Sequence, residues 1–320
     1  MTRPAAILVP SAAPARGAPA CRLCGARGLE VLARERRPGD PRPYTAAWCP
    51  GCGVVQAVEQ YDELSPVYVT MTEDGLNAGL LWEQGRHKRA AFREFWRRLD
   101  RVRPGWRGAA AGGEGGLAGR GRLRRLLDVG CGTGGFLAAA RAEGFEGFGF
   151  DACGPEADLA RAVHPNVRRA AGLAQYEAAL GRPVRADLVT LWDVLEHLRR
   201  PHAMLADLAH GLEPGGILFA ATPNGRAARL KARLYPRVGR RAGLAPWEHV
   251  FYYSPRALGR LVEEAGLGVL WVGPVACYRR GASLFEMVRR IGFAVSAAAA
   301  PGLSPQIGVF AEKPAGGCAG

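Results

Sequence analysis

The residues best suited to chemistry lie in a short glycine-rich segment near the middle of the chain. Residues 126–129 (LLDV) form an apolar run, residues 130–135 (GCGTGG) follow it, and a helical pattern comes next. Closely spaced glycines let the backbone turn sharply and let a ligand approach without meeting a Cβ atom. The start of the next helix offers unpaired N–H groups to a carboxylate or a phosphate. The segment therefore predicts a strand, a ligand-binding turn and a helix N-terminus.

This loop has two interpretations. Gly130, Gly132 and Gly135 match the dinucleotide-binding fingerprint G-x-G-x-x-G, and Asp151 follows at a suitable distance for a ribose hydroxyl. Residues 128–134 also read D-x-G-x-G-x-G, which resembles the first motif of the class I S-adenosylmethionine (SAM) methyltransferases. The choice between a nicotinamide enzyme and a methyltransferase depends on residues further along the chain.

Three later segments favour the methyltransferase. They are residues 147–151 (GFGFD), 186–198 (ADLVTLWDVLEHL) and 212–224 (LEPGGILFAATPN). They resemble the family's second strand, its fourth strand with a D-V-L-E-H-L exit, and its L-x-P-G-G turn with the fifth strand, in family order. The resemblance covers residues 123–314 and is specific to the small-molecule group of these enzymes (methyltransferase types 11, 12 and 23). It implies a Rossmann-like α/β domain with a seven-stranded sheet, in which the last strand is antiparallel beside the fifth.

The same resemblance implies roles in binding SAM. The backbone at Gly130 and Gly132 would pass against the methionine and ribose of the cofactor, with Asp128 bracing the loop. Asp151 would accept hydrogen bonds from both ribose hydroxyls. Adenine would lie near residues 173–174, and the methionine moiety near residues 192–193. The full predicted cofactor set is Asp128, Gly130, Cys131, Gly132, Gly134, Phe136, Asp151, Ala152, Leu173, Ala174, Trp192 and Asp193.

Two C-x-x-C-G knuckles near the N-terminus predict a metal site. Cys21 and Cys24 are separated from Cys49 and Cys52 by 24 residues, which a β-hairpin would fill. Two such knuckles give a four-thiolate tetrahedral zinc site with no open position, so the metal would be structural. A redox dithiol is the alternative. A similar zinc module precedes the SAM domain in bacterial sugar methyltransferases, which favours a substrate-docking role over nucleic-acid binding.

Candidate catalytic residues follow the predicted fourth and fifth strands. His197 comes directly after Glu196 at a strand exit, where acceptors bind in this fold. A histidine with a near-neutral pKa suits proton removal from a hydroxyl, and the neighbouring glutamate would orient it. His249 is the second candidate, because residues 246–254 (PWEHVFYYS) resemble the E-H-x-x-x-F-S stretch that closes the acceptor pocket in related enzymes.

An acid-free stretch precedes His249 and is rich in arginine. Its basic residues are Arg226, Arg229, Lys231, Arg233, Arg237, Arg240 and Arg241. One hypothesis is a lid that recognises a phosphate or carboxylate on the acceptor, because arginine binds such groups bidentately. The other is a solvated arginine-rich helix.

The elements that must position these residues alternate along the chain. We expect strands near residues 124–129, 147–151, 167–170, 186–191, 217–221, 268–273 and 306–311. Helices are expected near residues 135–143, 155–163, 173–180, 202–211, 255–265 and 283–296.

The predicted organisation is a disordered leader (1–20), a zinc ribbon (21–56), a helical cap (57–104), a glycine-rich linker (105–121), the SAM-binding domain (122–314) and a tail (315–320). Within the cap, the apolar spacing of Phe92, Phe95, Trp96 and Leu99 predicts a helix that packs on the main domain.

Bulk composition adds little to these motifs. The formal net charge is +14, but only Lys88, Lys231 and Lys313 are lysines, so an arginine-rich coding bias explains it as well as an anionic partner does. The sequence shows no signal peptide or membrane span, which predicts a cytoplasmic protein.

We expect a SAM-dependent methyltransferase that O-methylates a sugar or nucleotide-linked sugar. An RNA or protein methyltransferase and a non-catalytic SAM- or partner-binding protein remain the alternatives.

Overall fold

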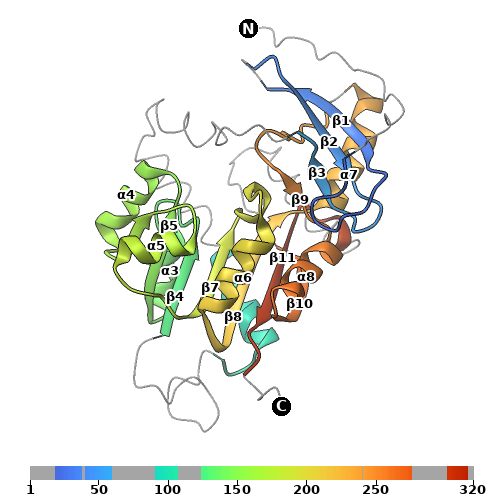
Figure 1. Ribbon diagram of the computed structural model, residues 1–320. Coiled ribbons are helices and arrows are strands. Elements are labelled where there is room, and N and C mark those ends of the chain that lie inside the picture. Colours follow the sequence, from blue (N-terminus) through green and yellow to red (C-terminus); the bar gives the residue numbers. More distant parts are fainter. Residues whose placement is uncertain are drawn as a thin grey trace, which may run out of the picture.

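The computed structural model describes residues 19–37, 40–59, 91–106, 124–239, 241–275 and 301–315. In this part of the chain the strands form two sheets, one of seven strands and one of four (Figure 1). Residues 1–18 of the expected leader, residues 60–90 of the expected cap and the expected helix at 283–296 lie outside the described residues, as do most of the expected linker and tail. None of the described helices is long and apolar enough to cross a membrane.

The larger sheet has the strand order β10-β11-β8-β7-β4-β5-β6. Its strands are β4 (Arg124–Val129), β5 (Phe145–Asp151), β6 (Val167–Arg169), β7 (Ala186–Trp192), β8 (Leu212–Pro223), β10 (Gly268–Pro274) and β11 (Gln306–Glu312). The pairs among β4 to β8 are parallel, whereas β11 is antiparallel to both β8 and β10. Every residue of β7 is buried, as expected for a central parallel strand covered on both faces. The predicted seven-stranded α/β fold, with its last strand antiparallel beside the fifth, is confirmed.

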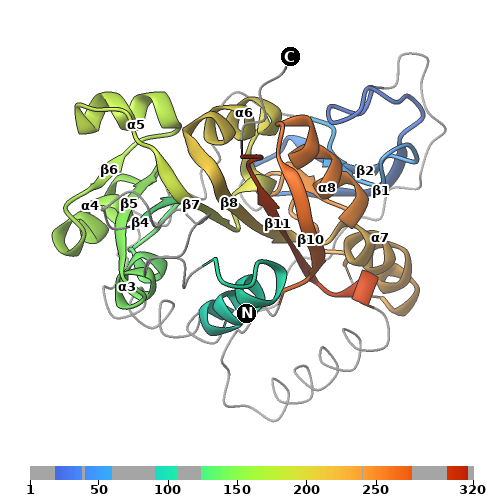
Figure 2. The ribbon, with the colours of Figure 1, turned by 90° about the horizontal axis from the view of Figure 1, so that it is seen from below.

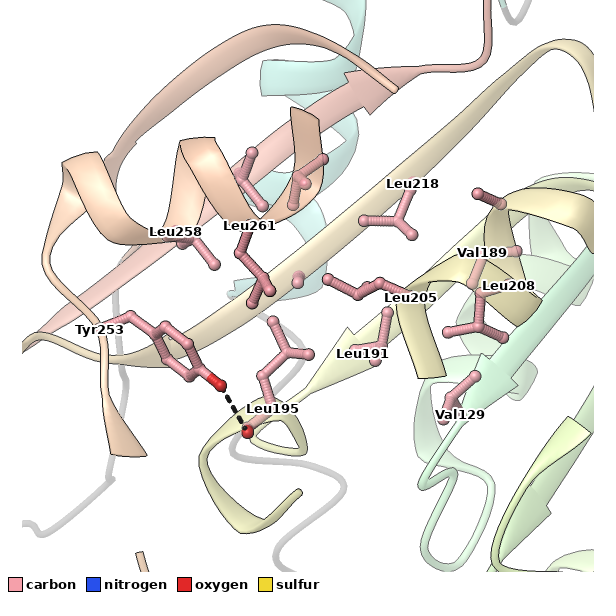
Figure 3. Close-up of a cluster of buried hydrophobic side chains, with 14 of the residues drawn as sticks. Val129, Val189, Leu191, Leu195, Leu205, Leu208, Leu218, Tyr253, Leu258 and Leu261 are labelled. Carbon is pink, nitrogen blue, oxygen red and sulfur yellow. Dashed lines mark hydrogen bonds between the residues drawn. The ribbon is translucent and has the colours of Figure 1, made fainter. Parts of the chain in front are cut away.

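Helices cover both faces of this sheet (Figure 2). One face packs against α5 (Leu173–Leu180), α6 (Pro201–Gly211) and α8 (Pro255–Glu264), and the other against α3 (Gly135–Ala142), α4 (Gly154–Val163) and the helical residues 91–102. Figure 3 shows Leu205 and Leu208 of α6 beside Val189 and Leu191 of β7, and Leu261 of α8 belongs to the same buried cluster. Burial of such side chains stabilises the fold by about 1.5–3 kcal/mol each.

The helix at residues 91–102 packs on the main domain as its apolar spacing predicts. Phe92, Phe95, Trp96 and Leu99 are all buried. The rings of Phe92 and Phe136 meet edge to face, with their centroids 4.9 Å apart. This part of the predicted cap is therefore one of the helical layers of the larger domain.

The small sheet combines residues from distant parts of the chain. Its strands, in order, are β1 (Glu30–Arg36), β2 (Pro43–Trp48), β3 (Val55–Ala57) and β9 (Phe251–Tyr252). The antiparallel pair β1–β2 is the hairpin expected between the cysteine knuckles. β9 comes from the segment beyond β8 and pairs with β3, so that Val55 lies opposite Tyr252. The helix α7 (Gly225–Leu234) packs against this sheet, with Ala228 and Ala232 in the same apolar cluster as Val55.

Candidate functional site

The glycine loop lies between β4 and α3, and its backbone requires glycine at three positions. The φ angles of Gly130, Gly132 and Gly134 are 66°, 52° and 81°, in the left-handed region that favours glycine. A Cβ on Gly130 would lie 2.5 Å from Val194 Cγ2, and one on Gly134 would lie 2.8 Å from His164 Cδ2. Among the described residues, the nearest atom to a Cβ on Gly132 would be Glu156 Oε2, at 3.5 Å. Close packing therefore surrounds the outer two glycines, while the part of the chain that the structure describes leaves Gly132 with an open side from which a ligand can approach.

Asp151 at the end of β5 holds this loop. Its Oδ2 accepts a hydrogen bond from the Gly132 N–H at 2.9 Å, and its Oδ1 accepts one from the Cys153 N–H at 2.8 Å. Burial raises the pKa of the carboxyl group above its ordinary value. An ionised carboxylate has about four lone-pair sites, so two remain for the ribose hydroxyls of a nucleoside. The residues present thus fit the predicted contact with SAM.

Asp128 also stabilises the loop, through the neighbouring strand. It is 2% exposed, and its Oδ1 accepts a hydrogen bond of 2.7 Å from the Thr190 hydroxyl on β7. A bond between buried side chains of β4 and β7 fixes the strand ends from which the loop and the predicted acceptor segment emerge.

The other predicted cofactor residues around the loop differ in exposure. Cys131 is buried, and burial raises the pKa of its thiol well above the ordinary value, which favours a packing role over a nucleophilic one. Phe136 lies in the aromatic cluster under residues 91–102. Ala152 and Ala174 are exposed, whereas Leu173 is buried in the core at the start of α5. Their predicted cofactor contacts stay predictions.

The exit of β7 carries two unusual residues. Trp192 is 9% exposed, and its indole N–H is buried with no hydrogen-bond partner among the described residues. Asp193 has a φ of 57°, which is uncommon for a residue other than glycine, and its carboxylate accepts a hydrogen bond from Gln306. Such strained residues occur frequently at functional sites. The partner on β11 is a residue that the sequence patterns did not single out.

The three predicted catalytic side chains lie together. Glu196 and His197 are in the short helix η3 (Leu195–His197), and His249 lies just before β9. One ligand atom from each of the three lies within 4.8 Å of the others, and the two imidazole centroids are 5.0 Å apart. The Val250 N–H donates to the backbone carbonyl of Glu196 at 2.7 Å, which ties the two segments together.

Each member of this cluster has a defined neighbour. The Thr222 hydroxyl donates to Glu196 Oε2 at 3.1 Å, and Glu196 is 1% exposed. His197 Nδ1 lies 2.8 Å from the carbonyl oxygen of Glu248. His249 Nδ1 lies 3.0 Å from the Tyr252 hydroxyl, and burial together with the charge of His197 lowers the pKa of His249 to about 3. His249 is therefore neutral at physiological pH.

The cluster and the glycine loop lie at the same edge of the sheet. β4 and β7 are parallel neighbours, so the loops at their carboxyl ends emerge side by side. The tight spacing between Gly130 and Val194 brings the loop against the residue two positions before Glu196. A cofactor on the loop and an acceptor at the cluster would thus be adjacent, as in other open α/β sheets that bind ligands at this edge.

The four predicted metal ligands also converge. The sulfur atoms of Cys21 and Cys52 are 3.7 Å apart, those of Cys24 and Cys49 are 3.6 Å apart, and all four lie within 4.8 Å of one another. The cysteines are free thiols. Four sulfurs placed tetrahedrally at about 2.3 Å from zinc would be about 3.8 Å apart, which these distances match closely. The geometry fits a structural zinc ion with no open position.

Two residues of the arginine-rich stretch have partners on the small sheet. Arg229 pairs with Glu30 at 3.2 Å, and its guanidinium lies 3.3 Å from the ring centroid of Trp48. Arg233 pairs with the same glutamate at 2.7 Å. These contacts attach α7 to the small sheet, so both arginines have a structural task that the lid hypothesis did not include.

Comparisons with known proteins agree with this geometry. A methyltransferase-domain family matches residues 86–271, which is more than half of the chain. The ubiquinone biosynthesis O-methyltransferase of Neisseria meningitidis serogroup C (strain 053442) is 30% identical over 165 residues, covering 46% of this chain and 65% of that protein. The protein of the same name from Azoarcus sp. (strain BH72) is 32% identical over 161 residues, covering 48% and 66%.

The chain thus spans slightly less than two thirds of the length of these relatives. Among solved structures, a SAM-dependent methyltransferase from Archaeoglobus fulgidus aligns with a TM-score of 0.44 and 20% identity, over 69% of this chain and 94% of that one. The match over residues 86–271 extends beyond the glycine loop to η3 before β8 and β9 after it. The chain belongs to this family of class I SAM-dependent methyltransferases.

Proposed function

We propose that the protein transfers a methyl group from SAM to a hydroxyl group of a small molecule. The observation that carries the proposal is the contact between the two halves of the site. The glycine loop at Gly130 packs against Val194, and the cluster of Glu196, His197 and His249 begins two residues later. A cofactor-binding loop and a group of proton acceptors are thereby held at one edge of one sheet.

The residues around the loop would bind the cofactor, which supplies a methyl group already made electrophilic by its sulfonium. Asp151 would accept hydrogen bonds from the ribose, and the open side of Gly132 leaves room for the ligand. The buried indole N–H of Trp192 would donate to an acceptor atom of the cofactor or the substrate.

The cluster would activate the acceptor. The hydroxyl must lose its proton as its oxygen bonds to the methyl carbon and the carbon–sulfur bond breaks, with that electron pair staying on sulfur. Burial lowers the pKa of His249 to about 3, so this ring is a weak proton acceptor at neutral pH and would orient the hydroxyl instead of taking its proton. His197 lies beside it and would take the proton, and the buried carboxylate of Glu196 would stabilise the proton on His197.

A sugar or nucleotide-linked sugar is the acceptor that the four-cysteine module favours, since such modules resemble those of bacterial sugar methyltransferases. Relatives named O-methyltransferases support oxygen as the methylated atom. The RNA and protein alternatives gain no support from Arg229 and Arg233, which pair with Glu30 instead of forming an open basic surface.

Calorimetric titration of the zinc-loaded protein with S-adenosylhomocysteine (SAH) tests the cofactor part of the proposal. We expect micromolar binding that Asp151→Ala abolishes. Asp158→Ala is the matched control, because Asp158 is an exposed acid on the neighbouring helix α4 that pairs with Arg161 on the same helix. Absence of SAH binding by the folded wild-type protein would contradict the proposal.

Acceptors would then be screened with methyl-labelled SAM. Neutral sugars, nucleotide-linked sugars and short RNAs form the panel, and product analysis identifies the methylated atom. Labelling of an RNA in preference to every small molecule would refute the small-molecule assignment. A steep fall of RNA binding with salt would accompany that outcome.

A further inference from the structure

The imidazole of His249 has a hydrogen-bond partner on one ring nitrogen and none on the other. Its Nδ1 lies 3.0 Å from the Tyr252 hydroxyl, and its Nε2 has no partner in the part of the chain that the structure describes. The side chain is half-buried beside Glu196 and His197, where the proposed function places the acceptor. The nitrogen that carries the proton therefore decides whether Nε2 accepts a hydrogen bond from a substrate or donates one.

The contacts of Tyr252 determine this tautomer. A hydroxyl has one proton to donate, and that of Tyr252 is directed to the backbone carbonyl of Leu244, an oxygen that only accepts. The hydroxyl oxygen is then left to accept, so the proton of the second hydrogen bond comes from His249 Nδ1. Burial raises the pKa of the Tyr252 hydroxyl above its ordinary value, so the phenol stays protonated and keeps this direction of donation.

The Leu244 carbonyl belongs to a turn that the small sheet holds in place. Glu35 on β1 accepts hydrogen bonds from the N–H groups of Leu244 and Ala245, each at 3.3 Å. Ala245 has a φ of 44°, and its carbonyl accepts from the N–H groups of Glu248 and His249 at 2.9 and 3.0 Å. A residue with such a φ persists only where the surrounding contacts fix it. The partner of Tyr252 and the backbone of His249 are therefore parts of one braced turn.

The charge state of His249 suits a hydrogen bond to a neutral group. Burial, and to a smaller extent the charge of His197, lower the pKa of His249 to about 3. A neutral imidazole with its proton on Nδ1 presents a lone pair at Nε2 and no donor there. A neutral hydroxyl donates a hydrogen bond to that lone pair. A carboxylate offers only lone pairs of its own, and the two groups repel each other.

We infer that Tyr252 is a positioning residue that holds His249 in its Nδ1–H form, and that Nε2 therefore selects acceptors that offer a neutral hydroxyl over acceptors that offer a carboxylate. The inference rests on the proposed function for the place of the acceptor, and it narrows the substrate class to alcohols and phenols. In this role Tyr252 acts through His249 and needs no contact with the acceptor.

Nuclear magnetic resonance of the ¹⁵N-labelled, zinc-loaded protein reads the tautomer directly, because protonated and unprotonated ring nitrogens have well-separated ¹⁵N shifts. The chain has six histidines, so His249→Gln assigns the signals. We expect the proton of wild-type His249 on Nδ1. Tyr252→Phe should lower the ratio of Nδ1–H to Nε2–H by about ten-fold, the effect of losing one hydrogen bond of ordinary strength. A wild-type proton on Nε2, or an unchanged ratio in Tyr252→Phe, overturns the positioning role.

Tyr253→Phe is the matched control. Tyr253 is the next residue along the chain, and its buried hydroxyl donates to the Leu195 carbonyl at 3.2 Å (Figure 3). This variant removes the same atom from the same segment, so the His249 tautomer should remain that of the wild type. An equal shift in both variants means that the loss of either buried hydroxyl loosens the segment, which overturns a specific role for Tyr252.

Phenol and benzoate test the selectivity, because they share a ring and differ in the group offered to Nε2. Each would be added at millimolar concentration to the SAH-loaded wild type at neutral pH, where phenol is neutral and benzoate is an anion. We expect a saturable change of the His249 Nε2 shift with phenol and none with benzoate. Tyr252→Phe should weaken the phenol response by about ten-fold. A benzoate response as large as that to phenol, or no response to phenol, overturns the selectivity.

SAH titration of every variant separates failure of this inference from failure of the proposed function. Tyr252→Phe and Tyr253→Phe should bind SAH as the wild type does, because neither hydroxyl belongs to the predicted cofactor set. Intact SAH binding with an unchanged tautomer ratio overturns the role of Tyr252 alone. No SAH binding by the folded wild type overturns the proposed function, whereas the tautomer measurement still holds because it needs neither cofactor nor acceptor.

Discussion

Two glycines of the cofactor loop should respond differently to the same substitution. Gly130 and Gly132 have similar φ angles of 66° and 52°, so alanine carries a similar backbone cost at both, about 1–2 kcal/mol. Their surroundings differ, because a Cβ on Gly130 would lie 2.5 Å from Val194 Cγ2, whereas one on Gly132 would meet, among the described residues, only Glu156 Oε2, at 3.5 Å. Overpacking of this kind typically costs about 1–3 kcal/mol more.

Gly130→Ala should therefore lower the free energy of unfolding by about 2–5 kcal/mol, and Gly132→Ala by about 1–2 kcal/mol. Urea unfolding of the zinc-loaded protein measures both. For SAH binding, the two substitutions should rank in the opposite order. Gly132→Ala should weaken SAH binding in a protein that stays folded, because its Cβ occupies the open side from which the cofactor approaches.

A double-mutant cycle isolates the clash. Val194→Ala removes the methyl group that a Cβ on Gly130 would meet, so the pair Gly130→Ala/Val194→Ala should be more stable than additivity predicts by about 1–3 kcal/mol. Val194→Ala combined with Gly132→Ala should be additive. Equal destabilisation by the two glycine substitutions, or an additive cycle at Gly130, would refute this reading of the loop.

Three further predictions follow from other contacts. Arg229→Ala should lower the free energy of unfolding by about 1–2 kcal/mol because it loses both Trp48 and Glu30, and Arg233→Ala by less than about 1 kcal/mol, in the same urea assay. Burial lowers the pKa of His164 below 6.5, so the unfolded chain binds a proton that the folded chain does not. Stability should fall below pH 6.5, by up to about 1.4 kcal/mol per pH unit from this group, and His164→Gln should reduce that slope in unfolding curves taken between pH 5 and 7. Chelation of the cysteine-bound metal should speed amide hydrogen exchange in β3 and also in β9, which pairs with it, while exchange in β4 and β5 stays slow.

Much of the larger domain was predictable because its signals are local. A buried parallel strand is recognised from a short apolar run, and a strand-to-helix turn from the glycines that follow it. For this reason the strands of the larger sheet and the helices α3, α4, α5, α6 and α8 overlap their predicted ranges, and the two cysteine knuckles converge as their spacing indicates. The helix α7 and the strand β9 had no predicted range, and β8 begins five residues before its predicted start at residue 217. The predicted domain boundaries and SAM contacts stay predictions.

Other parts of the site depend on contacts between distant residues. The patterns around His197 and His249 suggested two separate candidates, and only the side-chain distances and the backbone bond from Val250 to Glu196 show that they form one cluster. Tyr252 and Thr222 were missed because an aromatic or hydroxyl residue in a strand carries no functional signal until its partner is known.

The amino-acid sequence by itself determined the family, the seven-stranded α/β class of the larger domain and the convergence of the two cysteine knuckles, because each rests on motifs of residues close together in the chain. Only the tertiary structure decided that β9 joins the small sheet and that the segment before it brings His249 to Glu196 and His197. The physical reason is that strand pairing and side-chain burial across long loops depend on the whole packed molecule. These long-range contacts therefore cannot be predicted from any short stretch of residues.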